Sequence, residues 1–179
     1  MGIYLDKFKI NIKLFDDKFL TNPRRYIFQI GICIPIFILL LLLGDIVLRA
    51  PIVIAIASSA FTIFIIPRSI SSSIRRVVGG HLVAIIMGGI FILLLTLTGF
   101  NELYKENTLF RDIWISILVV LSFFIMVITD TEHPPAAGTI LGICLQDEWS
   151  WFAVLFILVS MLIMLSIKSI LLKKLINLV

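Results

Sequence analysis

The two histidines of this 179-residue chain lie in two short polar motifs, each beside a long apolar segment. His81 ends a Gly-Gly-His motif, and His133 lies in the run DTEHPP that extends from Asp130 to Pro135. Titratable groups beside lipid-compatible sequence are energetically unfavourable and mark ion or proton pathways in membrane proteins. We therefore expect the function of the protein at these two motifs.

A short helix is expected to begin directly after His133. Proline fits the first helical position, so Pro134 and Pro135 would open the helix and His133 would cap it. The next backbone N–H groups would lack partners, and such a helix end attracts anions through its free donors and its dipole. The predicted substrate-binding residues are His133, Pro134, Pro135, Ala136, Ala137 and Gly138, together with Ser58 and Ser59 of an earlier short apolar segment.

Two carboxylates of the same motif, Asp130 and Glu132, would repel an anion if they were ionised beside it. They either pair with Arg75, Arg76 or a histidine, or take up protons with the substrate, because apolar surroundings raise the pKa of a carboxylate. A third interpretation is that they cap the helix at the water interface. His81 is either a satisfied interhelical hydrogen bond or half of a two-histidine gate. We assign His81, Asp130 and Glu132 to gating or proton relay.

The loop from Pro67 to Arg76 combines serine hydroxyls with three arginines. Arginine binds planar or tetrahedral oxyanions through its fixed fork of donors. We therefore assign Arg68, Arg75 and Arg76 to a cytoplasmic anion mouth. The alternative is an ordinary cytoplasmic loop, which is also rich in basic residues.

The composition is that of an integral membrane protein. The hydrophobic fraction is 60% and the mean hydropathy is +1.15, whereas about half of the residues are apolar in soluble domains. We expect an N-terminal segment, 1–22, that is cytoplasmic and forms either an interfacial amphipathic helix or a solvated tail. One transmembrane domain, 23–179, would follow it.

Several function classes are excluded by what the sequence lacks. It contains no nucleophile arrangement, metal-ligand spacing or phosphate-binding glycine loop, so we expect no enzyme, no cofactor and no metal. The net charge of +4 arises from Lys and Arg at the ends of apolar runs, which argues against a nucleic-acid partner. Cys33 and Cys144 lie inside apolar stretches and are expected to be buried thiols rather than a disulfide.

Six apolar runs make up the predicted transmembrane domain. They are Tyr26–Leu43, Ile52–Ile66, Val77–Phe100, Ile113–Thr129, the shorter Pro134–Leu145, and Trp149–Ile167. Six crossings would place the basic N-terminal arm, the arginine loop and the basic C-terminus on one side, as the positive-inside rule requires. We therefore expect a multi-pass protein of the cell inner (plasma) membrane with N- and C-termini cytoplasmic.

The order of these runs predicts an internal repeat. A long helix, a short proline-headed segment and a second long helix occur twice, with the short segments beginning at Pro51 and Pro134. Units with an odd number of passes must be inverted relative to each other, and paired short segments of this kind point to a midplane site in transporters. We predict an all-α membrane fold of about six passes in two inverted three-helix repeats. The alternative is two ordinary short helices.

A stripe of small residues, Gly80, Ala84 and Gly88, follows one face of the predicted helix Val77–Phe100. Such a stripe lets a second helix pack closely, within the chain or between two protomers. A homodimer is the oligomeric state that we prefer.

The run from Asp130 to Thr139, DTEHPPAAGT, resembles the signature of the HPP family of integral membrane proteins. A second block is similar to another segment of that family, through Pro51, Ala57–Ala60, Phe64, Pro67, Arg75 and Val78–Leu82. Plant-chloroplast and cyanobacterial members of the family are associated with nitrite transport. The resemblance therefore implies a small-anion permease.

Residues and resemblance together predict a membrane transporter or channel for a small inorganic anion, with nitrite as the first candidate and proton coupling as an option. Its partners would be that anion, the lipid bilayer and a second copy of the chain. The alternative is a non-transporting membrane scaffold or sensor subunit.

Overall fold

The computed structural model describes residues 17–44, 50–146 and 149–178, and all regular elements among them are helical. This confirms the all-α fold class for the described residues. The predicted arrangement of residues 1–16 lies outside them. The elements are α1 (Asp17–Thr21), α2 (Pro23–Gly44), α3 (Ala50–Ile65), the 3-10 turn η1 (Ile70–Ser72), α4 (Ile74–Thr98), α5 (Asn101–Glu106), α6 (Thr108–Ile128), α7 (Ala136–Cys144) and α8 (Trp151–Leu171).

Among the residues that the structure describes, three helices, α4, α6 and α8, are long and apolar enough to cross a membrane. Each begins at a polar cap, because the side chains of Ser73, Asn107 and Ser150 accept hydrogen bonds from the first-turn amides. Helix α4 ends at Gly99, whose φ of 73° is the left-handed conformation that glycine adopts without strain. The predicted apolar runs therefore correspond to real helices with defined ends.

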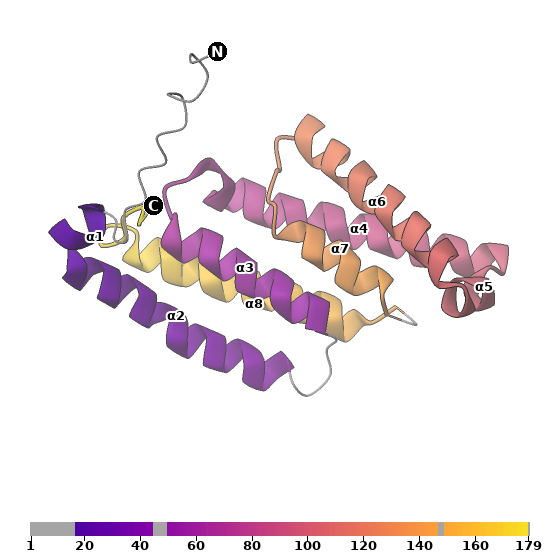
Figure 1. The fold of residues 1–179 in the computed structure, drawn as a ribbon, viewed down its shortest axis with the longest axis horizontal. Helices are drawn as coiled ribbons and strands as arrows, with labels where there is room; N and C mark the ends of the chain where they lie inside the picture. Colours follow the sequence, from indigo (N-terminus) through magenta and orange to yellow (C-terminus); the bar gives the residue numbers. More distant parts are fainter. Residues whose placement is uncertain (1–16, 45–49, 147–148, 179) are drawn as a thin grey trace, which may run out of the picture.

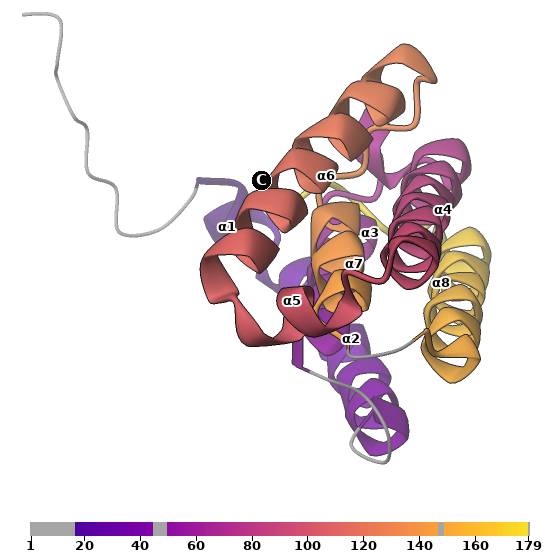
Figure 2. The ribbon, with the colours of Figure 1, turned by 90° about the vertical axis from the view of Figure 1, so that its right-hand side faces the viewer.

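The short helix α7 lies inside the bundle, between α3, α4 and α6 (Figures 1 and 2). It is antiparallel to α3, because Gly138 faces Ala55 and Gly142 faces Ile52. It is parallel to α4, because Gly80 faces Ala136 and Gly88 faces Ile143. The two proline-headed helices, α3 and α7, are thus direct neighbours.

Glycines permit this close approach. A Cβ atom on Gly138 would lie 2.9 Å from the Cβ of Ala55, and one on Gly88 would lie 2.7 Å from Cγ2 of Ile143. Neither spacing allows a side chain. The small-residue stripe of α4 therefore packs within the chain, against α7 and the segment that precedes it.

Helix α7 contributes to two apolar clusters. One joins α2, α3 and α8 with residues of α4 and Ile143 of α7, and the other joins α4, α5 and α6 with Ala136, Ile140 and Cys144 of α7. The C-terminal tail returns to the start of α2, since Leu178 donates to the Ile65 carbonyl and accepts from the Tyr26 hydroxyl at 2.7 Å. The N-terminal end of α2 and the end of the chain thus lie together.

Helix lengths bear on the predicted number of crossings. The helix predicted over Pro134–Leu145 begins only at Ala136 and has nine residues, which at 1.5 Å per residue is roughly 13 Å, against a hydrocarbon core of about 30 Å. Helix α3 has 16 residues. Helices α3 and α7 are thus shorter than a full crossing, whereas α2, with 22 residues, is as long as α6 and α8, and six passes with inverted repeats remain a prediction.

Gly142→Ala is expected to destabilise the fold. The added methyl group would lie 2.4 Å from Cγ1 and 3.0 Å from the backbone nitrogen of Ile52, and overpacking of this kind costs about 1–3 kcal/mol. Thermal unfolding of the purified protein in detergent measures the loss. Gly31→Ala is the matched control, because nothing lies within 4 Å of its added Cβ. Equal melting temperatures for the two variants would contradict the close packing of α7 on α3.

Candidate functional site

The two histidines meet at the hydroxyl of Ser59. Oγ of Ser59 lies 2.9 Å from Nε2 of His81 and 3.1 Å from Nε2 of His133, and the two ring centroids are 5.2 Å apart. All three side chains are buried. Residues separated by up to 74 positions in the sequence thus share one oxygen atom.

The outer nitrogen of each ring also has a partner. Nδ1 of His81 lies 2.8 Å from Oγ1 of Thr139 on α7, and Nδ1 of His133 lies 2.9 Å from the backbone carbonyl of Ser71 in η1. We call this set of residues, Ser59, His81, His133, Thr139 and the Ser71 carbonyl, the imidazole network. Each of its ring nitrogens is therefore satisfied, as buried polar groups require.

The Gly-Gly of the first motif positions the second motif. A Cβ atom on Gly80 would lie 2.8 Å from the Cβ of His133, and one on Gly79 would lie 2.4 Å from Cγ2 of Thr131. The segment from Thr129 to Pro135 therefore packs directly on the first turns of α4. It leaves α6 through Asp130, which has a positive φ of 56°.

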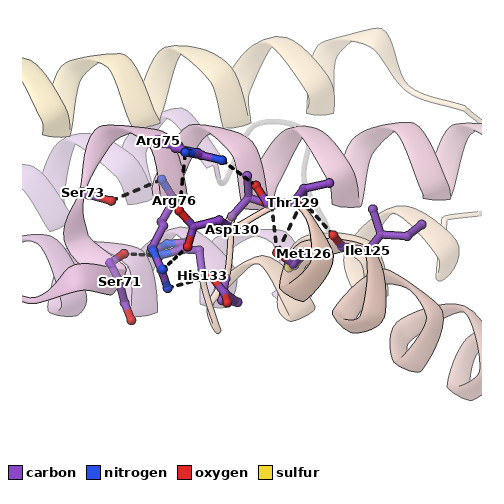
Figure 3. Close-up of polar contacts among 11 residues, drawn as sticks. Ser71, Ser73, Arg75, Arg76, Ile125, Met126, Thr129, Asp130 and His133 are labelled. Carbon is purple, nitrogen blue, oxygen red and sulfur yellow. Dashed lines mark hydrogen bonds and ion pairs between the residues drawn. The ribbon is translucent and has the colours of Figure 1, made fainter.

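The carboxylates of the second motif pair with arginines of α4 (Figure 3). Arg76 forms ion pairs with Asp130 and, at 2.6 Å, with Glu132, and Arg75 lies 3.5 Å from Asp130. Arg75 also donates to the Thr129 carbonyl at 2.9 Å. Of the three roles left open for these acids, pairing with arginine is the one that this structure contains.

The anion-binding helix end differs from the expectation. The amides of Ala136, Ala137 and Gly138 donate to the carbonyls of His133, Pro134 and Pro135 at 2.9–3.1 Å. The cap residue of α7 is Pro135 rather than His133, because the proline pair forms a tight turn before the helix. The expectation of free amides is therefore wrong for this structure, and the exposed Pro134 is the part of the turn that lines a groove.

Two predicted site residues lie apart from the network. Ser58 is exposed, and its hydroxyl donates to the Ala55 carbonyl at 2.9 Å. The Arg68 side chain is exposed, forms no ion pair within the described part of the chain, and contributes only its backbone amide to Asn177. The predicted arginine mouth is thus a pair, Arg75 and Arg76, which the acids already neutralise.

Sequence reasoning missed three groups. Thr139 is one residue beyond the predicted anion-binding run, and a hydroxyl on the inner face of a glycine-rich helix was the available signal. Ser71 contributes a carbonyl, which no side-chain pattern reveals. Lys168 of α8 is buried and donates to the carbonyl and, at 3.0 Å, to Oγ of Ser72. No acid pairs with Lys168 among the residues that the structure describes.

Grooves lie at the two ends of α7. Before its start, a largely apolar groove of about 270 Å³ is lined by Glu132, His133 and Pro134 with α6. Beyond its end, a groove of about 240 Å³ is lined by Lys105 and Arg111 together with Pro51, Tyr104, Cys144, Leu145 and Gln146. The imidazole network is therefore next to one groove and separated from the other by α7.

His133 lies outside the three membrane-length helices. Burial lowers the pKa of this histidine from 6.5 to about 4, while its hydrogen bond to the Ser71 carbonyl opposes the shift. At neutral pH the His133 ring is therefore uncharged.

An all-helical bundle with three membrane-length apolar helices and a buried polar network defines an integral membrane protein. The family described as HPP, transmembrane region, matches residues 21–176, and the chain belongs to this family. No curated protein and no solved structure matches the chain.

Arg76→Gln is expected to lower the free energy of unfolding by about 1–2 kcal/mol, because it leaves Glu132 without its cation and Asp130 with Arg75 alone. The Arg76 side chain is 19% exposed, so its ion pairs are only partly screened by water. Chemical or thermal unfolding in detergent measures the change. Arg68→Gln, at the exposed arginine without an ion pair, should leave stability unchanged. A similar loss in both variants would contradict a specific role for Arg76.

Proposed function

We propose that the protein is a membrane transporter for a small inorganic anion, with nitrite as the first candidate and a proton as co-substrate. The observation that supports it is the position of the imidazole network, buried beside α7 between grooves at the two ends of that helix. Polar networks at such positions mark ion and proton pathways in membrane proteins.

The barrier between the grooves is thin. Helix α7 has nine residues, which corresponds to roughly 13 Å along its axis. The far groove carries Lys105 and Arg111, which form ion pairs with the exposed acids Glu102 and Asp112, and an entering anion would exchange with these carboxylates. An anion that passes α7 would therefore cross much less than the about 30 Å thickness of the hydrocarbon core.

Proton coupling follows from the electrostatics of His133. Its burial disfavours the imidazolium form, and a neighbouring anion favours it. Anion and proton would thus bind together, and the pair carries no net charge. Neutral passage avoids the energetic penalty of moving a charge through the low-dielectric interior.

The same proposal includes six passes in two inverted units in the plasma membrane, with both termini cytoplasmic, and a homodimer. It is supported by the direct antiparallel contact of α3 and α7, the two proline-headed helices. Short helices that meet in this way are a feature of midplane sites in transporters. The anion mouth would then be Arg75 and Arg76 at the cytoplasmic end, where an incoming anion has to displace Asp130 and Glu132.

The competing function is a membrane scaffold or sensor subunit without transport. It is favoured by one observation, the complete hydrogen bonding of both rings, which a purely structural network would also have. The two functions differ in what a loss of His133 does to flux per folded protein.

Nitrite uptake into liposomes that contain the purified protein tests the proposal. Uptake should exceed that of empty vesicles and rise with an inward proton gradient. His133→Gln should reduce uptake per folded protein by roughly tenfold or more, because a charge-assisted hydrogen bond is lost. Thr96→Ala, whose exposed hydroxyl bonds to the Ile92 carbonyl within α4, is the control and should transport normally.

Two results would contradict transport. The first is no flux above empty vesicles at any pH with nitrite, nitrate, formate or chloride. The second is a His133→Gln protein that has lost stability but retains full flux per folded molecule, which would favour the scaffold.

A further inference from the structure

The tautomer of His133 is fixed by its surroundings. A carbonyl oxygen can only accept a hydrogen bond, so the contact with the Ser71 carbonyl requires a proton on Nδ1 of His133. A neutral imidazole has a single N–H, and Nε2 of the same ring must then be an acceptor. The Ser59 hydroxyl is therefore the donor in its contact with His133.

The rest of the network follows from this one assignment. Because the single O–H of Ser59 donates to His133, the Ser59 oxygen must accept a hydrogen bond from Nε2 of His81. Nδ1 of His81 is then bare and accepts from the Thr139 hydroxyl. With both rings neutral, the hydrogen bonds run in one direction, from Thr139 through His81 and Ser59 to His133 and the Ser71 carbonyl.

The network also has a second satisfied arrangement. The carbonyl of Ala55 lies 2.9 Å from Oγ of Ser59 on the same helix. If His133 gains a proton at Nε2, the Ser59 hydroxyl turns to Ala55, and its oxygen accepts from both rings. A hydroxyl has one donor and two acceptor lone pairs, so each of its positions is filled in this state too.

We propose that the imidazole network is a binding site for a single proton, that the proton is held at Nε2 of His133, and that Ser59 is the positioning residue whose hydroxyl rotates to admit it. One N–H bond forms at Nε2 and hydronium becomes water, while the Ser59 O–H bond stays intact and only turns. The coupling of this proton to an anion rests on the proposed function, but the site does not.

The geometry makes His133, rather than His81, the ring that takes up the proton. Protonation of His81 would add a proton at Nδ1, and the Thr139 hydroxyl would have to turn away from it. No other acceptor for Thr139 occurs within the described part of the chain. A second proton is disfavoured because the two ring centroids are 5.2 Å apart in a buried site, where like charges repel strongly.

The charged groups around His133 are balanced, apart from one. From α3 and η1 only uncharged groups, Ser59 and Ser71, face the ring. The acids of its own segment, Asp130 and Glu132, pair with Arg75 and Arg76 of α4. From α8, Lys168 binds Ser72, the neighbour of Ser71, and its charge opposes imidazolium formation. The charge of Lys168 thus opposes protonation of His133, while the hydrogen-bond network can still accept one proton.

Nitrogen NMR of the complete protein in lipid nanodiscs tests the site. With ¹⁵N in histidine alone and a purification tag that lacks histidine, all ring signals come from His81 and His133, the two histidines of the chain. In mildly alkaline buffer His133 should show a protonated Nδ1 and a bare Nε2, and His81 the reverse. On acidification the first imidazolium should be His133.

Ser59→Ala separates the positioning role from simple packing. Without the hydroxyl, a proton at Nε2 of His133 has no acceptor, so the His133 imidazolium should form roughly tenfold less readily, while Thr139 keeps the neutral His81 proton on Nε2. His133 should keep its proton on Nδ1. Ser58→Ala is the matched control, because its hydroxyl bonds to the same Ala55 carbonyl but contacts neither ring, and its spectrum should match the wild type.

Each other outcome overturns the assignment. The same tautomer in both rings, His81 as the first ring to titrate, or equal effects of Ser58→Ala and Ser59→Ala would do so. If Ser59→Ala does not fold, the wild-type spectrum alone still decides the direction of the network. If the NMR spectra show the predicted tautomers but no anion flux is measured, only the proposed transport is contradicted. If flux is measured but the tautomers differ, only the proton site is contradicted.

Discussion

One hydroxyl group, that of Ser59, has to satisfy two buried imidazole rings, and the arrangement of the inner helices depends on this constraint. It requires α3, α4 and the segment before α7 to come within hydrogen-bond distance of one oxygen atom. Such an approach is possible only where side chains are absent, which accounts for Gly80 beside His133 and Gly138 beside Ala55. An unpaired ring nitrogen at this depth would cost about 1–3 kcal/mol. The close packing at the glycines and the hydrogen bonds of the two rings therefore require the same helix positions.

Charge in the described residues is separated along the bundle in a way that suits a membrane. The ion pairs of Arg75 and Arg76 lie where Asp130 is 55% exposed, so water screens them in part. The imidazole network behind them is buried, and its His133 ring is uncharged at neutral pH. Lys168 is the exception, because its buried ammonium group is held by the oxygens of Ser72 rather than by an acid. Because Ser72 directly follows Ser71, whose carbonyl contacts His133, this cation makes the network's surroundings slightly positive.

The sequence predicted the helices well because each apolar run has a clear end, such as Ser73 before α4 and Gly99 after it. It also indicated that the acids of the His133 motif could pair with arginines. It did not predict that His81 and His133 meet through Ser59, since this depends on the relative shift of three helices along their axes, which hydrophobic periodicity leaves open. The amides of α7 were predicted wrongly for a local reason. Two successive prolines form a turn whose carbonyls accept those amides, and helix-start rules describe only a single proline.

The chemistry of the network bears on whether it only holds helices together. Buried polar groups can often be replaced by well-packed apolar residues with no loss of stability, so a purely structural role gives little reason to keep two imidazoles. A structural network also needs one satisfied arrangement, whereas this one has two that differ by the rotation of the Ser59 hydroxyl between His133 and the Ala55 carbonyl. A site that binds a proton reversibly requires two arrangements that are equally well hydrogen-bonded and differ by one proton. The local geometry thus favours a group that changes its protonation during function over one that merely fixes α3 against α4.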